Sequence, residues 1–201
     1  MERLVLIPGG SWQTAAERAA RVLRGGGVAL LPAEGVYGLH ALAQNRTAVE
    51  RLLLLKRRSP DKHFIGLIAE PEEMERWAEA SPRALALARE HWPGALTIVL
   101  RASPAIPESM RHEDGTIALR CPGSAFLREV VAGAGGIVLS TSANEPGESP
   151  SIRPVGKVAE SADLVVDQGP LSGEPSTVVA VEGDQVRVLR EGAVRLSGRR
   201  T

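Results

Sequence analysis

The side chains that could do chemistry in this sequence lie where its predicted helices and strands end. Cations and neutral hydrogen-bond donors make up the set: Lys56 and Arg58, Thr116 and Arg120, Ser142 and Asn144, Ser176 and Arg190. Fixed cations beside neutral donors, with no acid–base pair among them, favour the binding of a polyanion and the stabilisation of negative charge that develops on it. Phosphoryl and nucleotidyl transfer depend most on this chemistry, because positioning and electrostatics do nearly all the work there.

Several other kinds of site are excluded or disfavoured. The sequence has neither GxxxxGK[ST] nor GxGxxG after a predicted strand, so the common phosphate loop and the dinucleotide fingerprint are absent. Cys121 follows Arg120, but no base lies near it in the sequence, and a buried, inert thiol is the favoured interpretation. The histidines lack metal-ligand spacing, and we expect surface or turn positions for His40, His63, His91 and His112.

The stretch Ser140–Gly147 places hydroxyl and amide groups directly behind an apolar strand, Gly136–Leu139. A loop at a strand end can present such groups to a ligand without adding charge. In a plain connector the same groups would only bond their own backbone, and for this stretch taken alone that interpretation is favoured. The other strand-end groups in the chain reverse the preference. Among them, Arg120 ends an apolar strand, where a charged side chain needs an anionic partner.

The elements that must position these groups begin with a helix and a strand. Ser11 is predicted to cap a helix that ends at the glycines of 25–27. Val28–Leu31 then forms a buried strand that Pro32 ends. The next segment, 33–39, is predicted to be a loop because it contains two glycines. Such a loop after a buried strand is either a ligand position or a structural turn.

A second helix, capped by Asn45, is predicted to end at the cations Lys56–Arg58. Cations at a helix C-terminus favour the helix dipole and are more often solvated than functional. Beyond them, apolar patterns predict strands over 64–68, 96–100, 116–120, 162–167, 178–181 and 186–190, and helices over 71–79, 82–90 and 124–132. Helices and strands interspersed in this way predict an α/β protein, a single domain over 1–201 with a mixed parallel/antiparallel sheet.

Composition limits the possible partners. The 201 residues, 43% of them apolar, supply one sizeable core, and 3% aromatic residues leave few rings on which bases could stack. The formal net charge is zero, so no global attraction to nucleic acid or to anionic membranes is expected. One cysteine excludes an internal disulfide framework, and no stretch resembles a signal peptide or a membrane span. We therefore expect a cytoplasmic protein without a membrane partner.

Six motifs, in order along the chain, resemble those of the threonylcarbamoyladenylate synthases. The resemblance runs from about Val28 to Gly192. Its motifs are P-A-E-G-V-Y-G-L at 32–39, K-R-R at 56–58, W-P-G-A-L-T at 92–97, T-I-A-L-R at 116–120, S-T-S-A-N at 140–144 and, as a closing pair, E-P-S-T-V at 174–178 with L-R-E-G at 189–192. Any one of these motifs is weak evidence, whereas six in register are specific.

The resemblance implies both a fold and a reaction. The fold is a twisted α/β domain with flanking helices and a large, concave, positively charged cavity, and no additional C-terminal domain is expected. The reaction converts L-threonine, bicarbonate and ATP into threonylcarbamoyladenylate and pyrophosphate, with Mg²⁺ assisting. The product serves the threonylcarbamoyl modification of adenosine 37 in tRNA, so partner proteins that carry it to tRNA are implied as well.

Roles for individual residues follow from their positions in the motifs. The resemblance implies a catalytic tetrad, ATP contacts and L-threonine contacts, but no metal bound by the protein itself. The tetrad is Lys56, Arg58, Ser142 and Asn144; the ATP contacts are Lys56, Arg58, Lys62, Thr116, Asn144, Ser151 and Arg190; the L-threonine contacts are Gly35, Arg120, Ser142 and Ser176. In this reaction a carbamate oxygen attacks the α-phosphate, so no side-chain nucleophile is required.

A second hypothesis arises from departures from the family motifs. Ala33 and Gly35 stand where the family usually has two threonines, the second of which normally faces the amino-acid substrate. The loss of these hydroxyls, together with the family's positive cavity, motivates a non-catalytic paralogue that binds double-stranded RNA or tRNA. Such a protein would show RNA affinity that falls steeply with salt, and it would release no pyrophosphate.

Overall fold

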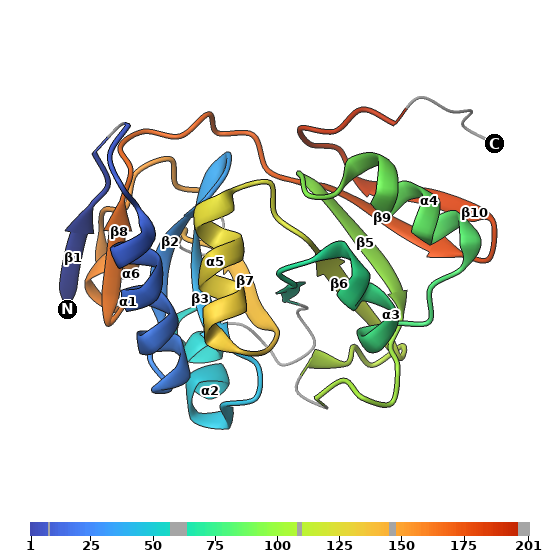
Figure 1. The fold of residues 1–201 in the computed structure, drawn as a ribbon, viewed down its shortest axis with the longest axis horizontal. Coiled ribbons are helices and arrows are strands. Elements are labelled where there is room, and N and C mark those ends of the chain that lie inside the picture. Colours follow the sequence, from blue (N-terminus) through green and yellow to red (C-terminus); the bar gives the residue numbers. More distant parts are fainter. Residues whose placement is uncertain (8, 57–63, 108–109, 145–147, 197–201) are drawn as a thin grey trace.

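A single mixed sheet runs the length of the protein. The computed structural model describes residues 1–7, 9–56, 64–107, 110–144 and 148–196, and within them the strand order is β1-β8-β2-β3-β7-β4-β6-β5-β9-β10 (Figure 1). The pairs β1–β8, β2–β8, β4–β6 and β5–β9 are parallel, and the other neighbouring pairs are antiparallel. The prediction of an α/β fold with a mixed sheet is confirmed.

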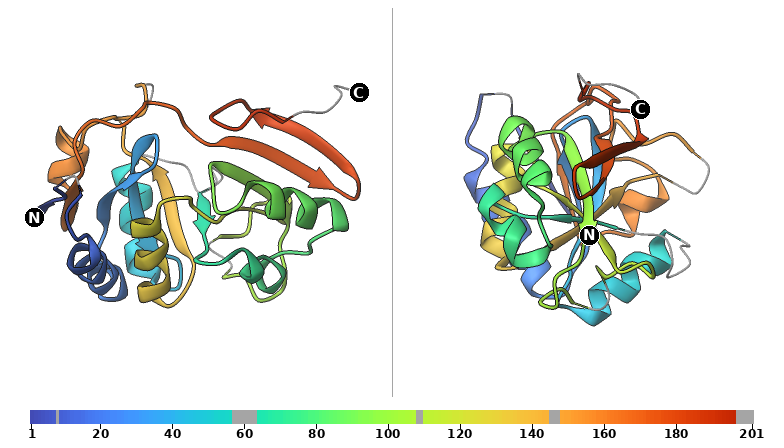
Figure 2. Two further views of the ribbon diagram at one scale, coloured as in Figure 1. Left: turned by 45° about the horizontal axis from the view of Figure 1, so that its top comes forward. Right: turned by 90° about the vertical axis from the view of Figure 1, so that its right-hand side faces the viewer.

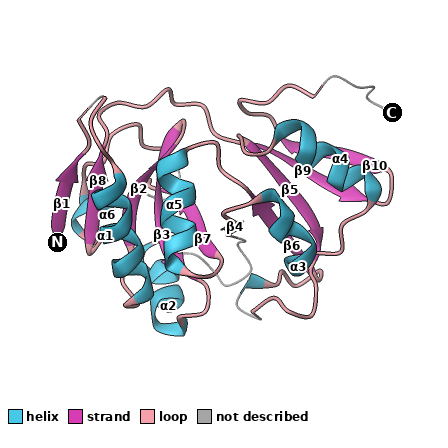
Figure 3. Ribbon diagram, in the orientation of Figure 1, coloured by secondary structure: helices cyan, strands magenta, loops and turns pink. Residues whose placement is uncertain are grey.

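The elements have the following bounds. The strands are β1 (Glu2–Val5), β2 (Ala29–Ala33), β3 (Val36–Leu42), β4 (Ile65–Leu67), β5 (Leu96–Arg101), β6 (Thr116–Arg120), β7 (Val138–Ser142), β8 (Leu164–Asp167), β9 (Thr177–Glu182) and β10 (Gln185–Arg190). The helices are α1 (Gln13–Arg24), α2 (Arg46–Leu55), the 3₁₀ turn η1 (Pro71–Glu73), α3 (Met74–Trp77), α4 (Pro82–His91), α5 (Ala125–Ala134) and α6 (Lys157–Glu160). Figure 3 shows that the helices lie along both halves of the sheet.

The sheet is strongly twisted. Viewed along the long axis, its strands fan out around the centre of the molecule (Figure 2, right). Helices α1 and α5 pack against each other and against β2, where Leu23, Leu31 and Val130 belong to one apolar cluster. The other cluster joins α2 and α4 to the sheet and includes Leu52 and Leu87. The core is therefore built mainly from aliphatic side chains, as the low aromatic content requires.

Three predictions in the first helix and hairpin are wrong. Ser11 does not cap α1, because its hydroxyl donates to Gln13 Oε1 at 2.7 Å and the N-cap position falls on Trp12. Pro32 lies inside β2, and the segment 33–39 forms a β2–β3 hairpin with only Glu34 and Gly35 at its turn.

The position of Pro32 explains why a strand tolerates it. Its partner Tyr37 directs its backbone N–H away from β2, to Ser151 O at 2.8 Å, so Pro32 and Tyr37 form a pair without mutual hydrogen bonds. On its other side, β2 pairs with β8 only through Ala29 and Leu30. The missing N–H of Pro32 therefore leaves no ladder bond unmade.

Other helix and strand predictions agree with the structure. Asn45, Ser81 and Ser124 cap α2, α4 and α5 through their side chains, and α2 ends at Leu55. Several boundaries differ by one or two residues, and two differences are larger. The predicted helix 71–79 is a 3₁₀ turn followed by the short α3, and β7 extends through Ser142, so the first three residues of Ser140–Gly147 belong to a strand rather than to a loop. No helix among the described residues is long and apolar enough to cross a membrane.

Candidate functional site

The T-x-A-x-R and S-T-S-A-N motifs lie on strands that share one face of the sheet. Thr116, Ala118 and Arg120 alternate along β6, so their side chains point to the same side. Ile65 of β4 pairs with Ala118 on one flank and with Ser140 of β7 on the other. Residues directly opposite one another in a sheet point the same way, so alternate positions of both motifs share this face. We call it the site face.

The closing motifs join the same face through β5 and β9. Val99 pairs with Ala118, and Thr97, two residues earlier on β5, therefore has the same orientation. Its Oγ1 lies 2.9 Å from Ser176 Oγ, which is buried. Arg190 of β10 donates its Nε and Nη2 to Ser176 O at 3.1 and 2.8 Å, and Nη2 also contacts Ser176 Oγ at 3.0 Å. Ser176 and Arg190, which the motifs predict in different roles, thus form one hydrogen-bonded unit.

Lys56 connects the end of α2 to the end of β7. Its Nζ donates to Ser142 O at 2.8 Å and to Asn144 Oδ1 at 3.1 Å, and it also contacts Asn144 O. Ser142 Oγ donates to Asn144 Oδ1 at 2.5 Å, and Asn144 Nδ2 donates to Glu148 O at 2.7 Å. Lys56 is only 4% exposed, so the expectation of a solvated cation is wrong for this residue. At the end of β7, the carbonyl oxygens of Ser142 and Asn144 and the amide oxygen of Asn144 supply three acceptors for this ammonium group.

Three of the four predicted tetrad residues are therefore in direct contact. Lys56 is 86 residues from Ser142 and 88 residues from Asn144 in the sequence, and its Nζ contacts both. The remaining member, Arg58, and the predicted ATP contact Lys62 lie outside the described residues.

Arg120 has the anionic partner that the sequence required. The guanidinium forms an ion pair with Glu34 of the β2–β3 turn, and its Nε donates to Gly94 O at 3.0 Å. The Glu34 carboxylate also accepts the backbone N–H groups of Gly123 and, at 3.1 Å, Ser124, which precede α5. Burial lowers the pKa of Arg120, and the Glu34 charge opposes that shift. The sequence did not identify Glu34 as a site residue, although it lies inside the first motif.

Gly35, a predicted L-threonine contact, lies where no side chain fits. A Cβ atom built on it would lie 1.8 Å from Glu174 O, and Gly173 N donates to Gly35 O at 2.7 Å. The backbone of 173–174 thus fills the space that a threonine side chain would need at this position. Ser151, a predicted ATP contact, accepts a hydrogen bond from Tyr37 N through its carbonyl, which places it beside the same hairpin.

Thr116 starts β6 within a local hydrogen-bond network. Its Oγ1 donates to Asp114 Oδ1 at 2.7 Å and lies 2.9 Å from His112 Nδ1. Asp114 also accepts the Thr116 backbone N–H at 3.0 Å, which is typical of a turn that a short acidic side chain closes. The orientation of Thr116 toward the site face agrees with a ligand contact, and its predicted role toward ATP stays a prediction.

Two histidines contradict the expectation of surface or turn positions. His40 is completely buried in β3, with Nε2 3.2 Å from Ser140 Oγ, and burial lowers its pKa to about 4. His112 is also buried, at 7% exposed. The apolar residues around His40 in V-Y-G-L-H-A-L were a signal of a buried strand. His63 lies outside the described residues. The predicted burial of Cys121 is confirmed, and burial raises the pKa of its thiol to about 12.

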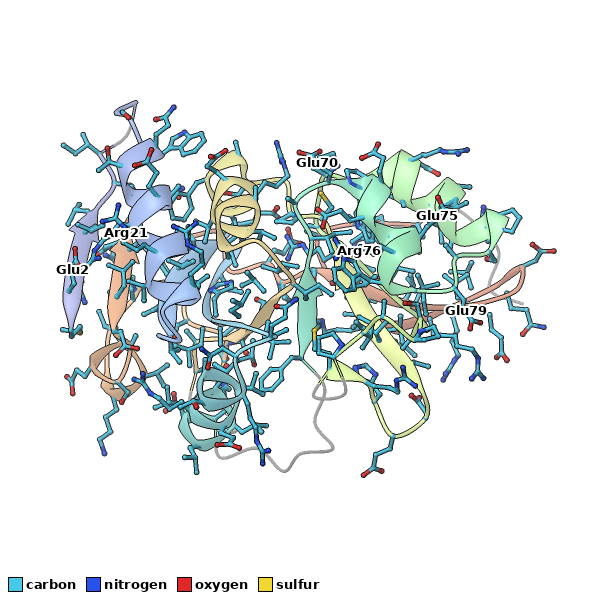
Figure 4. All side chains as sticks on the ribbon, turned by 60° about the horizontal axis from the view of Figure 1, so that its bottom comes forward. Glu2, Arg21, Glu70, Glu75, Arg76 and Glu79 are labelled. Atoms are coloured by element: carbon cyan, nitrogen blue, oxygen red, sulfur yellow. The ribbon has the colours of Figure 1, made fainter. Side chains whose placement is uncertain are left out.

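The expected large, positively charged cavity is not observed and stays a prediction. One groove of about 1390 Å³ lies between α4 and the β9–β10 hairpin, and of the predicted site residues it includes Arg190. Its charged lining balances four arginines against four acids: Arg83, Arg187, Arg190 and Arg195 against Glu90, Glu182, Asp184 and Glu191. Glu70, Glu75 and Glu79 lie around α3 (Figure 4). This distribution does not favour the RNA-binding hypothesis, which needs a basic face.

Comparisons with known proteins agree on one family. The family model Sua5_yciO_yrdC, described as "Telomere recombination", matches residues 21–192. A Coxiella burnetii protein named threonylcarbamoyl-AMP synthase is 37% identical over 133 residues, which are 66% of this chain and 72% of that protein.

Two solved structures share the fold. P. abyssi Sua5 complexed with L-threonine superposes with a TM-score of 0.84 at 29% identity, over 95% of this chain and 57% of that one. E. coli YciO superposes with a TM-score of 0.85 at 24% identity, over 96% of each chain, and shows the fold alone. The chain thus spans little more than half the length of the P. abyssi protein.

Proposed function

The chain belongs to the Sua5/YciO/YrdC family, and from that premise we propose that it makes threonylcarbamoyladenylate from L-threonine, bicarbonate and ATP, releasing pyrophosphate. The observation that carries this proposal is the contact of Lys56 with Ser142 and Asn144. Relatives named threonylcarbamoyl-AMP synthase, and the L-threonine complex of the P. abyssi protein, support the choice of reaction and of amino acid. The proposed product serves tRNA modification through partner proteins.

The Lys56 cluster suits the phosphates of ATP. The ammonium group of Lys56 donates to three oxygens of the β7 end, so it places a positive charge at a fixed position, and its attraction for a phosphate is electrostatic. Ser142 Oγ and Asn144 Nδ2 lie at the same place, where they donate to Asn144 Oδ1 and Glu148 O. When the carbamate oxygen attacks the α-phosphate, negative charge grows on the departing pyrophosphate, and a fixed cation stabilises that charge more than it stabilises the ground state.

The part of the site face around Arg120 suits the amino acid. The guanidinium of Arg120 presents a planar set of donors that matches a carboxylate. Arg190 lies close enough for its charge to lower the pKa of Arg120, and it holds Ser176 through three hydrogen bonds. We assign the carboxylate of L-threonine to Arg120 and the neighbouring polar contact to Ser176, while Arg190 faces the ATP.

Magnesium would arrive with ATP rather than with the protein. Among the described residues, no three His, Cys, Asp or Glu side chains are grouped so that they could hold a metal ion. Mg²⁺ commonly keeps several waters and binds through substrate phosphates, so we take the ion to be one that ATP carries. The ion would neutralise phosphate charge alongside Lys56.

The direct test is release of pyrophosphate from ATP in the presence of bicarbonate, Mg²⁺ and L-threonine. We expect release that depends on L-threonine and that Lys56→Met abolishes. Lys157→Met, at an exposed residue of α6, is the matched control and should retain activity. Release without threonine dependence would contradict the proposal. RNA binding that weakens steeply with salt, with no pyrophosphate released, would favour the non-catalytic hypothesis instead.

A further inference from the structure

The turn between β2 and β3 holds a residue in an unfavourable backbone conformation. Glu34 has φ +67°, in the left-handed region that side chains other than glycine rarely adopt. Placing such a residue there costs free energy, because its Cβ crowds the backbone. A glycine at 34 would adopt the same backbone without that cost. A glutamate in this position therefore needs a compensating interaction from its side chain.

The carboxylate of Glu34 supplies that compensation. One oxygen pairs with Arg120, and the other accepts the N–H groups of Gly123 and Ser124 at the start of α5. The Glu34 side chain is 21% exposed and that of Arg120 is 8% exposed, so the pair is largely removed from water. Charge-assisted hydrogen bonds in such surroundings are stronger than neutral ones.

The same contacts fix the direction of the guanidinium. Glu34 holds Nη2, and Gly94 O accepts from Nε, so two sides of the planar group are occupied. Nη1 of Arg120 has no hydrogen-bond partner among the described residues. Arg190 is near enough to act on Arg120 electrostatically, so a second cation faces this part of the site face. Nε and Nη2 of Arg120 are therefore fixed by hydrogen bonds, while Nη1 can donate to an incoming anion.

We propose that Glu34 is a positioning residue: it holds Arg120 so that the unused end of its guanidinium binds the carboxylate of the amino-acid substrate. This inference rests on the proposed function, since the carboxylate is taken to be that of L-threonine. Glu34 itself does not touch the substrate. It acts through Arg120, by tying the guanidinium to the start of α5 and to the β2–β3 turn.

An opposite role is conceivable for the same contact. The Glu34 carboxylate could occupy the anion position and have to leave before the substrate binds. That role predicts tighter substrate binding when the carboxylate is removed, whereas a positioning role predicts weaker binding. The three hydrogen bonds of the Glu34 carboxylate favour the positioning role, because displacing the carboxylate would break all three at once.

The variant Glu34→Gly distinguishes three roles for Glu34: positioning Arg120, occupying the anion position, and stabilising the turn. It relieves the backbone conformation, so a loss of binding cannot be attributed to strain. We expect L-threonine affinity, measured by isothermal titration calorimetry, to fall by about tenfold or more, since one charge-assisted interaction is lost. ATP affinity should change by less than about twofold, because Lys56 is not affected. Glu34→Asp should restore part of the affinity, and Glu174→Gln, an exposed carboxylate beside the same turn, is the matched control.

Unchanged or tighter L-threonine binding by a folded Glu34→Gly protein would overturn the inference while leaving the proposed function intact. If the wild-type protein does not bind L-threonine, the proposed function fails, and a second readout decides the inference. That readout is the solvent exchange rate of the Arg120 Nε–H group, followed by ¹⁵N NMR. Faster exchange in Glu34→Gly than in Glu174→Gln supports the positioning role, and equal exchange overturns it.

Discussion

The two halves of the sheet differ in how their strands are buried. Every residue of β2 is buried, and so are the first six residues of β3, because α1 and α5 cover one face and the apolar cluster of α2 covers the other. In β9 the burial alternates: Thr177, Val179 and Val181 are buried, whereas Val178 and Ala180 are half-buried. Strands β2 and β3 are thus covered on both faces, and β9 on only one.

This difference explains where the predicted site residues gather. On the site face, Val99, Ala118, Val178 and Ala180 belong to neither apolar cluster. Val99, Val178 and Ala180 are half-buried, so this part of the face is less covered than the opposite side, against which α3 and α4 pack. Ligand contacts placed on an open face of a well-packed sheet are held by rigid elements, which improves their precision. The covered half supplies stability, and the open half supplies the site.

The largest stability effect should come from the covered half. Leu31→Ala in β2 removes a completely buried side chain that packs against α1 and α5, and we expect the free energy of unfolding to fall by about 2–5 kcal/mol. Urea denaturation followed by circular dichroism measures this. A loss below 1 kcal/mol would mean that the covered half is packed no better than the open one.

The buried His40 should give the covered half a pH dependence. Its pKa in the folded protein is about 4, against an ordinary value of 6.5, so the unfolded chain takes up the proton first as the pH falls. Stability is therefore complete above about pH 6.5 and is lost between pH 6.5 and 4, by roughly 3 kcal/mol in total. Denaturation curves at several pH values should show this slope for the wild type and a shallower one for His40→Gln. Equal slopes would contradict the prediction.

An intermediate effect is expected where the two halves meet. Lys56→Met removes the donor that Ser142 O and Asn144 share, and unsatisfied acceptors in a buried place should cost about 1–3 kcal/mol of unfolding free energy. The same variant should lose ATP affinity, which calorimetry measures. A variant that binds ATP normally but unfolds easily would make Lys56 a structural residue alone.

The smallest effect should come from the open face itself. Val178→Ala truncates a half-buried side chain that packs into neither cluster, and we expect less than about 1 kcal/mol of stability to be lost. Val179→Ala, its buried neighbour on the opposite face, is the matched comparison and should cost more. Equal losses at 178 and 179 would show that the site face is covered after all.

Local chemistry made much of the fold predictable. Asn45, whose side chain accepts a helix N–H group, was identified as a cap from the sequence, and the structure confirms it. The errors occurred where a neighbouring element decided the outcome. Pro32 can lie in a strand because β8 pairs with β2 only at Ala29 and Leu30 and does not reach Pro32. Lys56 is buried because its ammonium group donates to backbone oxygens at the end of β7. Neither neighbour is close in sequence.

The sequence by itself determined the mixed α/β fold, the family, and the residue types that a polyanion site needs, because periodic apolar patterns and ordered motifs are local properties of the chain. Tertiary structure decided which of those residues meet. Glu34 and Arg120 are 86 positions apart, as are Lys56 and Ser142, and only the path of the sheet brings each pair together. Strand order and twist fix such contacts, and these depend on packing across the whole molecule rather than on any one segment.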